Sequence, residues 1–284
     1  DAWADYECRF QLPGRTTPDH GFTAPRWQGE ALPGKTLLLH AEQGYGDTLQ
    51  MIRYAPYVAE RVGRISLWAP KSLRTLLATV NGVDELVAAK PPDDTFHAHL
   101  PLMSLPGVFG DSLETIPKKT PYLGNFTEIN TEKPVEIGLA WAGSDNQPLD
   151  RRSVLLSELT ALLSVDGVKW QSLQLGEETG QIAASDWAGM IQDSSDQLTD
   201  FAATAAVIAK LDLIICVDSA VAHLAGALGK PAWVLLSFAP DWRWGWEGES
   251  SPWYPSTRLF RQRYGETWAS VGERMATAIG SLIV

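Results

Sequence analysis

Short apolar runs that alternate with helical segments constrain the fold of this chain more than any other feature. The runs "KTLLLH" (35–40) and "LDLIICV" (211–217) are apolar on both faces, as strands buried inside a parallel sheet are. An amphipathic segment (44–63) follows the first run, and an alanine-rich segment follows the second. Strands that alternate with helices predict parallel sheets, in which ligands bind beyond the carboxyl ends of the strands.

The alternation falls into two blocks, which predict two Rossmann-like, doubly wound α/β domains at 35–130 and 131–284. Residues 1–34 contain several Pro and Gly and read as a leader. The chain begins at Asp1 without a methionine, so we expect a piece of a longer protein. Further strands are expected near 64–70, 84–88, 96–100, 135–143, 169–175 and 231–238, and helices near 71–80, 157–164, 199–210 and 267–282.

Charge and cysteine content exclude several classes of function. The 284 residues carry a net charge of -11, which disfavours a nucleic-acid partner, because such affinity comes mainly from cationic side chains. The sequence contains no run of about 18 apolar residues, so it predicts no membrane span. Cys8 and Cys216 lie far apart and suggest no disulfide framework, which favours a reducing, cytoplasmic setting.

The turn "HAEQGYGDTLQ" (40–50) is the first of three that could carry chemistry. Gly44 and Gly46 allow a tight turn and the close approach of a ligand, and Asp47 falls near the start of the next helix. A glycine turn with an N-cap explains the same residues. A dinucleotide fingerprint would need a third glycine where Leu49 stands, so NAD binding is disfavoured.

The second turn, "GLAWAGSDNQPLDRRSV" (138–154), joins small residues at a strand end to a pair of arginines. The backbone at Gly143 and Ser144 can approach an anion, and the guanidinium groups of Arg151 and Arg152 can bind phosphate oxygens. Two solvated loop arginines are the alternative interpretation.

The third turn, "VDSAVAHLAGALGKP" (217–231), runs from a strand end into a helix. Asp218 or Ser219 can cap that helix, whose first N–H groups favour an anion, and His223 projects from the first turn or so. A capped core helix with a buried histidine is the alternative.

A tryptophan-rich stretch (238–255) contains too much Pro and Gly for regular structure. Trp242 and Trp244 could stack on a sugar or a base, or they could simply pin the loop to the body of the domain.

Together these residues resemble the ADP-heptose:lipopolysaccharide heptosyltransferase superfamily, of GT-B fold. The resemblance rests on Gly46-Asp47, on "GLAWAG", and on Asp218-Ser219 followed by His223. It is nearest to the glycosyltransferase-like domains that follow tetratricopeptide repeats in bacterial proteins. "DAWADYECRF" (1–10) resembles the segment that joins such repeats to the domain.

The resemblance implies two domains facing a cleft, with a nucleotide-sugar donor held mainly by the second and with the last helix packing back on the first. Asp47 would be the general base. Ser219, Ala220 and the helix N-terminus would meet the donor diphosphate, assisted by His223. No metal or other cofactor is expected, and the chain has no obvious Asp-x-Asp motif. The heptosyltransferase pattern has Gly where this chain has Ala220, so the donor sugar stays open.

Two functions are compatible with these patterns. The first is an inverting, metal-independent glycosyltransferase of the bacterial cytoplasm, acting on a protein or surface-glycan acceptor, with tetratricopeptide-like repeats upstream. The second is a non-catalytic module that keeps the fold for nucleotide binding or protein interaction.

Overall fold

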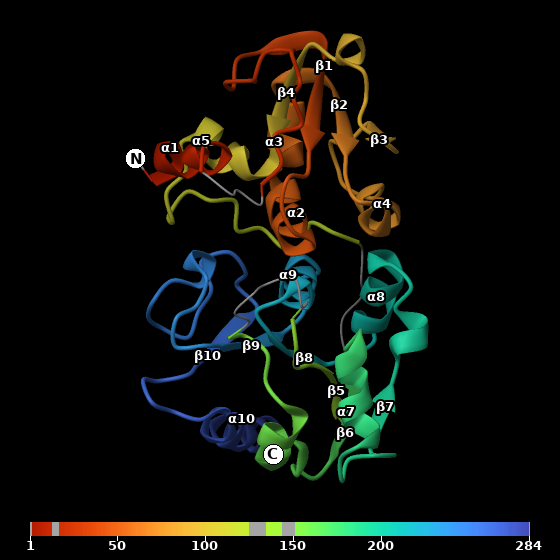
Figure 1. The fold of residues 1–284 in the computed structure, drawn as a ribbon, viewed down its shortest axis with the longest axis vertical. Helices are drawn as coiled ribbons and strands as arrows, with labels where there is room; N and C mark the ends of the chain where they lie inside the picture. Colours follow the sequence, from red (N-terminus) through yellow and green to blue (C-terminus); the bar gives the residue numbers. More distant parts are fainter. Residues whose placement is uncertain (1, 13–16, 125–134, 144–150, 284) are drawn as a thin grey trace. The chain divides into compact units, whose positions relative to one another are not determined.

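The computed structural model divides the chain into two compact units, residues 1–124 and residues 125–284 (Figure 1). It describes residues 2–12, 17–124, 135–143 and 151–283. Each unit has its own parallel sheet, as the alternation of strands and helices predicts.

Unit 1 contains a four-stranded parallel sheet in the order β3-β2-β1-β4. Its strands are β1 (Leu32–His40), β2 (Val62–Trp68), β3 (Glu85–Val87) and β4 (Ala98–Pro101). Its helices are α1 (Ala2–Tyr6), η1 (Glu7–Phe10), α2 (Tyr45–Met51), η2 (Ile52–Tyr54), α3 (Ala55–Ala59), α4 (Lys71–Leu77), η3 (Asp93–Thr95), η4 (Leu102–Ser104) and α5 (Leu105–Phe109), where η marks a 3-10 helix. The leucines of "KTLLLH" are fully buried in β1, as expected for a central strand.

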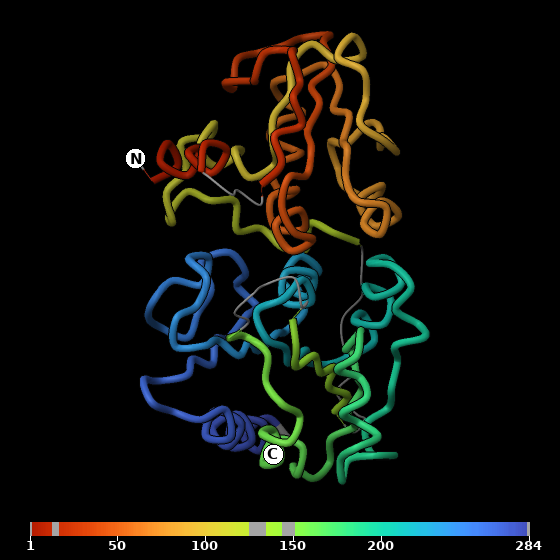
Figure 2. Tube along the Cα trace, viewed as in Figure 1, coloured from red at the N-terminus to blue at the C-terminus, as the bar shows by residue number. Residues whose placement is uncertain are grey.

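The leader predicted at residues 1–34 is an integral part of unit 1. Trp27 is fully buried, and its backbone N–H donates to the carbonyl of His99 in β4 at 2.9 Å. The indole of Trp3 in α1 donates to the carbonyl of Asp111 at 2.7 Å, and α1 contacts α5 (Figure 2). Pro and Gly content predicts irregular backbone here, but it does not report that the Trp27 side chain is buried.

Unit 2 contains a six-stranded parallel sheet in the order β10-β9-β8-β5-β6-β7. Its strands are β5 (Val135–Ala140), β6 (Val168–Ser172), β7 (Ile191–Asp193), β8 (Leu213–Val217), β9 (Ala232–Leu236) and β10 (Thr257–Arg261). Its helices are η5 (Leu156–Leu159), α6 (Thr160–Leu163), η6 (Glu177–Thr179), α7 (Gly180–Ala183), η7 (Ser195–Gln197), α8 (Phe201–Ile208), α9 (Ala220–Ala227), η8 (Trp242–Trp244) and α10 (Trp268–Ile283).

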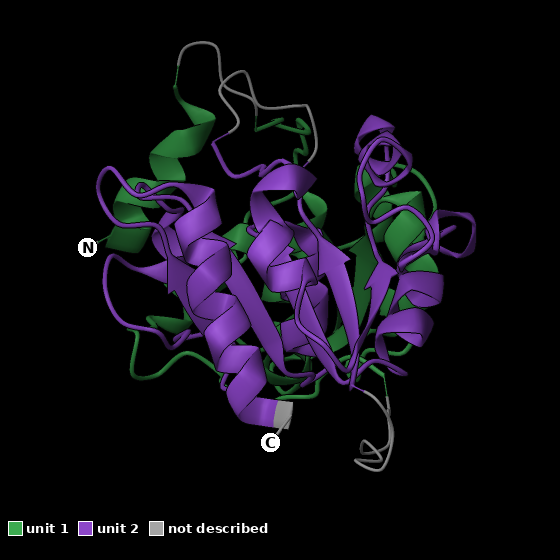
Figure 3. Cartoon of the chain, turned by 90° about the horizontal axis from the view of Figure 1, so that it is seen from below, with its two compact units in different colours: residues 1–124 green, residues 125–284 purple. Residues whose placement is uncertain are grey.

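Helix α10 packs on unit 2 (Figure 3), and the expectation that it packs back on the N-terminal domain stays a prediction. Trp268, Val271, Met275 and Ile279 recur at helical spacing and are buried in the core of unit 2. That core also contains Leu159, at the end of η5, and Leu162 and Leu163 of α6. The apolar face of the helix is therefore covered by its own unit.

Each sheet has one point where the direction of strand addition reverses. In unit 1 the chain runs from β1 outward to β3 and then returns to place β4 on the other side of β1. In unit 2 it runs from β5 outward to β7 and returns to place β8 beside β5. Loops diverge at such a switch point and leave a crevice at the carboxyl ends of the strands, where open α/β sheets bind ligands.

Candidate functional site

The switch point of unit 1 contains the turn from β1 into α2, with Gly44, Gly46 and Asp47. The Gly44 N–H donates to Oδ2 of Asp47 at 2.7 Å, so the carboxylate caps the helix in which it lies. A Cβ on Gly44 would lie 3.0 Å from that oxygen, so a larger residue there would require the Asp47 side chain to shift. The half-buried Asp47 carboxylate therefore caps the helix, and its role as a base stays a prediction.

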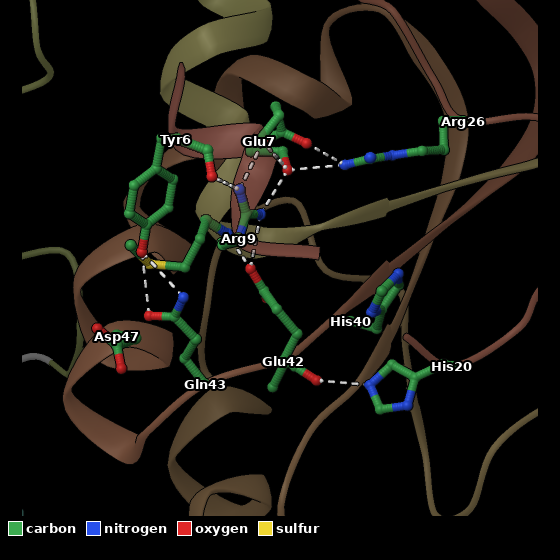
Figure 4. A network of polar contacts seen from close by, with 12 residues as sticks. Tyr6, Glu7, Arg9, His20, Arg26, His40, Glu42, Gln43 and Asp47 are labelled. Carbon is green, nitrogen blue, oxygen red and sulfur yellow. Dashed lines mark hydrogen bonds and ion pairs between the residues drawn. The ribbon is translucent and has the colours of Figure 1, made fainter. Parts of the chain in front are cut away.

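Behind this turn lies a buried network of charges that the sequence patterns do not reveal (Figure 4). The Glu42 side chain is 1% exposed, and its Oε1 accepts from Nη2 of Arg9 at 3.1 Å. Arg9 also donates to Glu7 at 2.7 Å and to Oγ of Ser104 at 2.8 Å. Arg26 donates to the other oxygen of Glu7 at 2.6 Å. The N-terminal segment thereby reaches the carboxyl ends of both β1 and β4.

Three histidines from different segments gather at the same strand ends. Nε2 of His40 lies 3.1 Å from Nδ1 of His99, and the rings of His20 and His40 are 5.2 Å apart. Burial and the neighbouring cations lower the pKa of His40 to about 2, and burial also lowers the pKa of His99. The three rings line a cavity of about 230 Å³, together with Phe10, Pro18, Asp19, Phe22, Ala24, Arg26 and Pro101.

The switch point of unit 2 brings together the second and third turns that the sequence singles out. Nη1 of Arg152, after β5, donates to the backbone carbonyl of Asp218, after β8, at 3.2 Å. Burial raises the pKa of the Asp218 carboxyl, and the adjacent Trp244 and Arg152 side chains oppose that rise. Arg151 is exposed, and Ser144 lies outside the described residues. One arginine of the predicted pair is therefore anchored at the crevice.

Ser219 is the N-cap residue of α9, but its hydroxyl does not cap the helix. Its Oγ is buried and has no hydrogen-bond partner among the residues that the structure describes. Ala220 follows as the first residue of α9 and is partly buried. The first N–H groups of this eight-residue helix carry the positive end of its dipole, which suits an anionic ligand.

The backbone N–H groups after β5 already have partners inside the protein. Gly143 donates to Oγ of Ser153 at 3.0 Å. Trp141 and Ala142 both donate to Oε1 of Gln174, at 3.0 and 2.9 Å. The contact between Gly143 and a ligand therefore stays a prediction, and in this structure a serine ten residues later accepts the hydrogen bond of the Gly143 N–H.

His223 is a buried residue of α9 with 5% of its surface exposed. Its Nδ1 lies 2.9 Å from the hydroxyl of Tyr254, and its ring stacks on Trp244 at a centroid distance of 5.3 Å. These contacts correspond to the core-histidine interpretation. They also place the imidazole one turn beyond the Ser219 cap.

The two tryptophans predicted to stack on a ligand have different environments. Trp244 is 1% exposed, so its ring is not accessible to a ligand in this structure. Trp242 is 42% exposed, and the guanidinium of Arg243 lies 4.7 Å from its ring centroid. Trp246, in the same tryptophan-rich stretch, is 76% exposed.

Within the described ranges, no group of three or more His, Cys, Asp or Glu side chains is arranged to hold a metal ion. Nor does the described part of the chain contain a helix with the length and hydropathy needed to cross a membrane.

Comparison with known proteins places these residues in context. Residues 198–267, which include Asp218, Ser219 and His223, match the model of glycosyltransferase family 9 (heptosyltransferase). Protein FlbA of Caulobacter vibrioides is 28% identical over 312 aligned positions, which cover 98% of this chain and 52% of FlbA. The chain thus spans about half the length of this curated relative.

Solved structures similar to this one share its two-sheet architecture. A family 9 glycosyl transferase from Veillonella parvula superposes with a TM-score of 0.60 at 12% identity, covering 90% of this chain and 99% of that one. ADP-heptose lipopolysaccharide heptosyltransferase II from E. coli gives 0.57 at 16% identity, covering 87% and 98%. At these identities the likeness concerns the fold, which is α/β with two parallel sheets and matches the GT-B heptosyltransferases.

Proposed function

We propose that this protein transfers a sugar from a nucleotide-sugar donor to a hydroxyl group of a protein or surface-glycan acceptor, with inversion and without a metal ion. The observation that carries the proposal is the convergence of Arg152, Asp218 and Ser219 at the switch point of unit 2. A helix N-terminus, a guanidinium and a serine hydroxyl that has no partner among the described residues together suit a diphosphate.

In the proposed reaction Asp47 is the general base. Its carboxylate accepts the proton of the acceptor hydroxyl while the hydroxyl oxygen forms a bond to the anomeric carbon. The bond from that carbon to the donor phosphate breaks, and its electron pair leaves with the nucleoside diphosphate. The dipole of α9 and the charge of Arg152 stabilise the growing negative charge. The cavity beside His40 and His99 offers unit 1 a place to hold part of the acceptor.

The setting proposed for this activity is the bacterial cytoplasm. We also propose that tetratricopeptide-like repeats precede this region in a longer chain and present a protein acceptor, since residues 1–10 resemble the segment that follows such repeats.

Calorimetric titration with UDP, GDP, ADP and CMP tests the donor site directly. We expect one of these nucleotides to bind, and we expect Arg152→Met to weaken its binding through the loss of a cation. If none binds, the donor site is refuted, and a non-catalytic interaction module becomes the better description.

The role of Asp47 is tested with Asp47→Asn, because the amide oxygen can still accept the Gly44 N–H and preserve the cap. Release of nucleoside diphosphate from the matching nucleotide-sugar should fall by roughly 10²- to 10⁴-fold, while nucleotide affinity stays unchanged. Asp94→Asn, at an exposed acid of the same unit, is the control and should behave as wild type. Equal release by Asp47→Asn and Asp94→Asn would contradict the role of Asp47 as base.

A further inference from the structure

The cavity of about 230 Å³ in unit 1 reaches the carboxyl ends of two neighbouring strands. His40 is the last residue of β1, His99 lies in β4, and both are buried residues of the cavity wall. Asp19 and Arg26, which also line the cavity, are exposed, so a ligand can enter from solvent. The volume suits one sugar ring and lies below the roughly 300–1,000 Å³ of pockets for drug-sized ligands.

One ring nitrogen of His40 lacks a partner. Its Nδ1 is buried and has no hydrogen-bond partner among the described residues, whereas its Nε2 lies 3.1 Å from Nδ1 of His99. Burial and the neighbouring cations lower the pKa of His40 to about 2, so the ring is neutral, and Nδ1 is a donor or an acceptor according to the tautomer. A ligand hydroxyl can both donate and accept, so it satisfies either tautomer.

Two other polar groups of the cavity favour a ligand that donates hydrogen bonds. Nε2 of His20 lies 3.2 Å from the carbonyl oxygen of Ala41 (Figure 4). Because a carbonyl only accepts, that nitrogen carries the proton, and Nδ1 of the neutral His20 ring is left as an acceptor. Asp19 presents a carboxylate, of which one oxygen accepts from the Gly21 N–H at 3.0 Å. A ligand rich in hydroxyl groups complements both acceptors.

The charges around the cavity disfavour an anionic ligand. Among the described residues that line it, Asp19 and Arg26 are the charged ones. The guanidinium of Arg26 forms an ion pair with Glu7 at 2.6 Å, which balances its charge. Lys90 is not part of the lining, and its Nζ donates to the backbone carbonyl of His20 at 2.5 Å. The Asp19 carboxylate would therefore repel an anion, but it would accept from a neutral hydroxyl.

We propose that this cavity binds one neutral sugar residue, whose hydroxyl groups bond to Asp19 and to Nδ1 of His40 while its C–H groups pack on Phe10 and Phe22. Both phenylalanines line the cavity and supply apolar surface beside the polar groups. The role of this sugar as part of the acceptor rests on the proposed function. The cavity thereby selects a neutral glycan, rather than an unmodified protein, as the acceptor.

The test is an NMR titration of the full 284-residue chain, labelled with nitrogen-15 in its histidines, at pH 7.5. Methyl glycosides of glucose, galactose, mannose and N-acetylglucosamine are the neutral probes, and methyl glucuronide is the acidic one. We expect at least one neutral glycoside to shift the Nδ1 signal of His40 saturably, with a dissociation constant on the order of 1 mM. Methyl glucuronide should bind about tenfold more weakly or not at all. The His40 signal is the one that His40→Gln removes.

Asp19→Asn separates the binding of a hydroxyl from the local structure, because the amide oxygen can still accept from the Gly21 N–H. This change should weaken the binding of the neutral glycoside about tenfold and reduce the discrimination against methyl glucuronide. Glu60→Gln removes one charge from an exposed acid of the same unit that does not line the cavity, so it should bind as wild type does.

Failure of every neutral glycoside to shift the His40 signal would overturn the proposal. Equal or tighter binding of methyl glucuronide, or unchanged affinity in Asp19→Asn, would overturn it as well. If His40→Gln fails to fold, saturation-transfer difference spectra of the same glycosides with wild type and Asp19→Asn decide in its place. The titration contains no nucleotide, so its failure is distinct from a failure of nucleotide binding, which would refute the proposed function itself.

Discussion

His40 should make the protein lose stability in mild acid, because it is enclosed as a neutral imidazole. Its ring is 3% exposed, bonded to His99 through Nε2, and surrounded by the rings of His20 and Phe22 at 5.2 and 5.3 Å. These surroundings lower its pKa from 6.5 to about 2, with burial as the largest cause. The folded protein therefore excludes a proton that the unfolded chain binds.

The sign and the size of the effect follow from proton linkage. The pKa of His40 is lower in the folded protein than in the unfolded chain. The stability that depends on this group is therefore complete above pH 6.5 and is lost as the pH falls below 6.5. One excluded proton changes the free energy of unfolding by about 1.4 kcal/mol per pH unit, so moving from pH 7.5 to 5.0 should remove roughly 2 kcal/mol. That is a large part of a typical stability of about 5–15 kcal/mol.

Urea unfolding, followed by circular dichroism at both pH values, measures this change. His40→Gln should be less stable than wild type at pH 7.5, because the ring packing is lost. Between pH 7.5 and pH 5.0, however, its free energy of unfolding should fall by roughly 2 kcal/mol less than that of the wild type. His97→Gln, at an exposed histidine of the same unit, should keep the wild-type decline. If His40→Gln declines as steeply as wild type, the enclosed neutral imidazole is not the source of the acid sensitivity.

Two further predictions concern packing and thiol access in the same molecule. In Gly226→Ala the new Cβ would lie 2.4 Å from atoms of the buried Tyr254 ring, so the free energy of unfolding should fall by about 1–3 kcal/mol. Gly280→Ala is the control, because the space around its Cβ is open. In the same urea assay Gly280→Ala should be neutral or stabilising. Equal effects of the two changes would contradict the clash. Cys8 is exposed, whereas Cys216 is buried and its burial raises the pKa of its thiol. A thiol reagent should therefore modify only Cys8 in the native protein. A second fast-reacting thiol would refute this prediction.

Several strands and helices of this fold were predictable because their signals are local. Apolar runs correctly located β1, β8 and β9, and the helical spacing of Trp268, Val271, Met275 and Ile279 located α10. By contrast, β7 and β10 were not predicted: one is three residues long, and the other follows a loop rich in Pro and Trp. Their strand character depends on pairing with β6 and β9 rather than on periodicity.

The candidate site was predictable only in part. The turns containing Asp47, Arg152 and Ser219 carry recognisable residue types at strand ends, and the order of strands puts the last two together. Glu42 follows a strand signal too, but nothing near it in the sequence identifies Arg9, which is 33 residues away. A leader rich in Pro and Gly gives no periodic signal for a buried arginine.

The sequence by itself determined the alternation of strands and helices, and with it two parallel sheets whose ligand-binding edges lie at the carboxyl ends of the strands. Only the tertiary structure decided which side chains are enclosed there. Trp244 is buried against His223, whereas Trp242 remains accessible. Glu42 is buried and forms an ion pair with Arg9. The physical reason is that periodicity reports which face of one segment is apolar, whereas burial of a polar or aromatic group depends on segments distant in the sequence that pack against it.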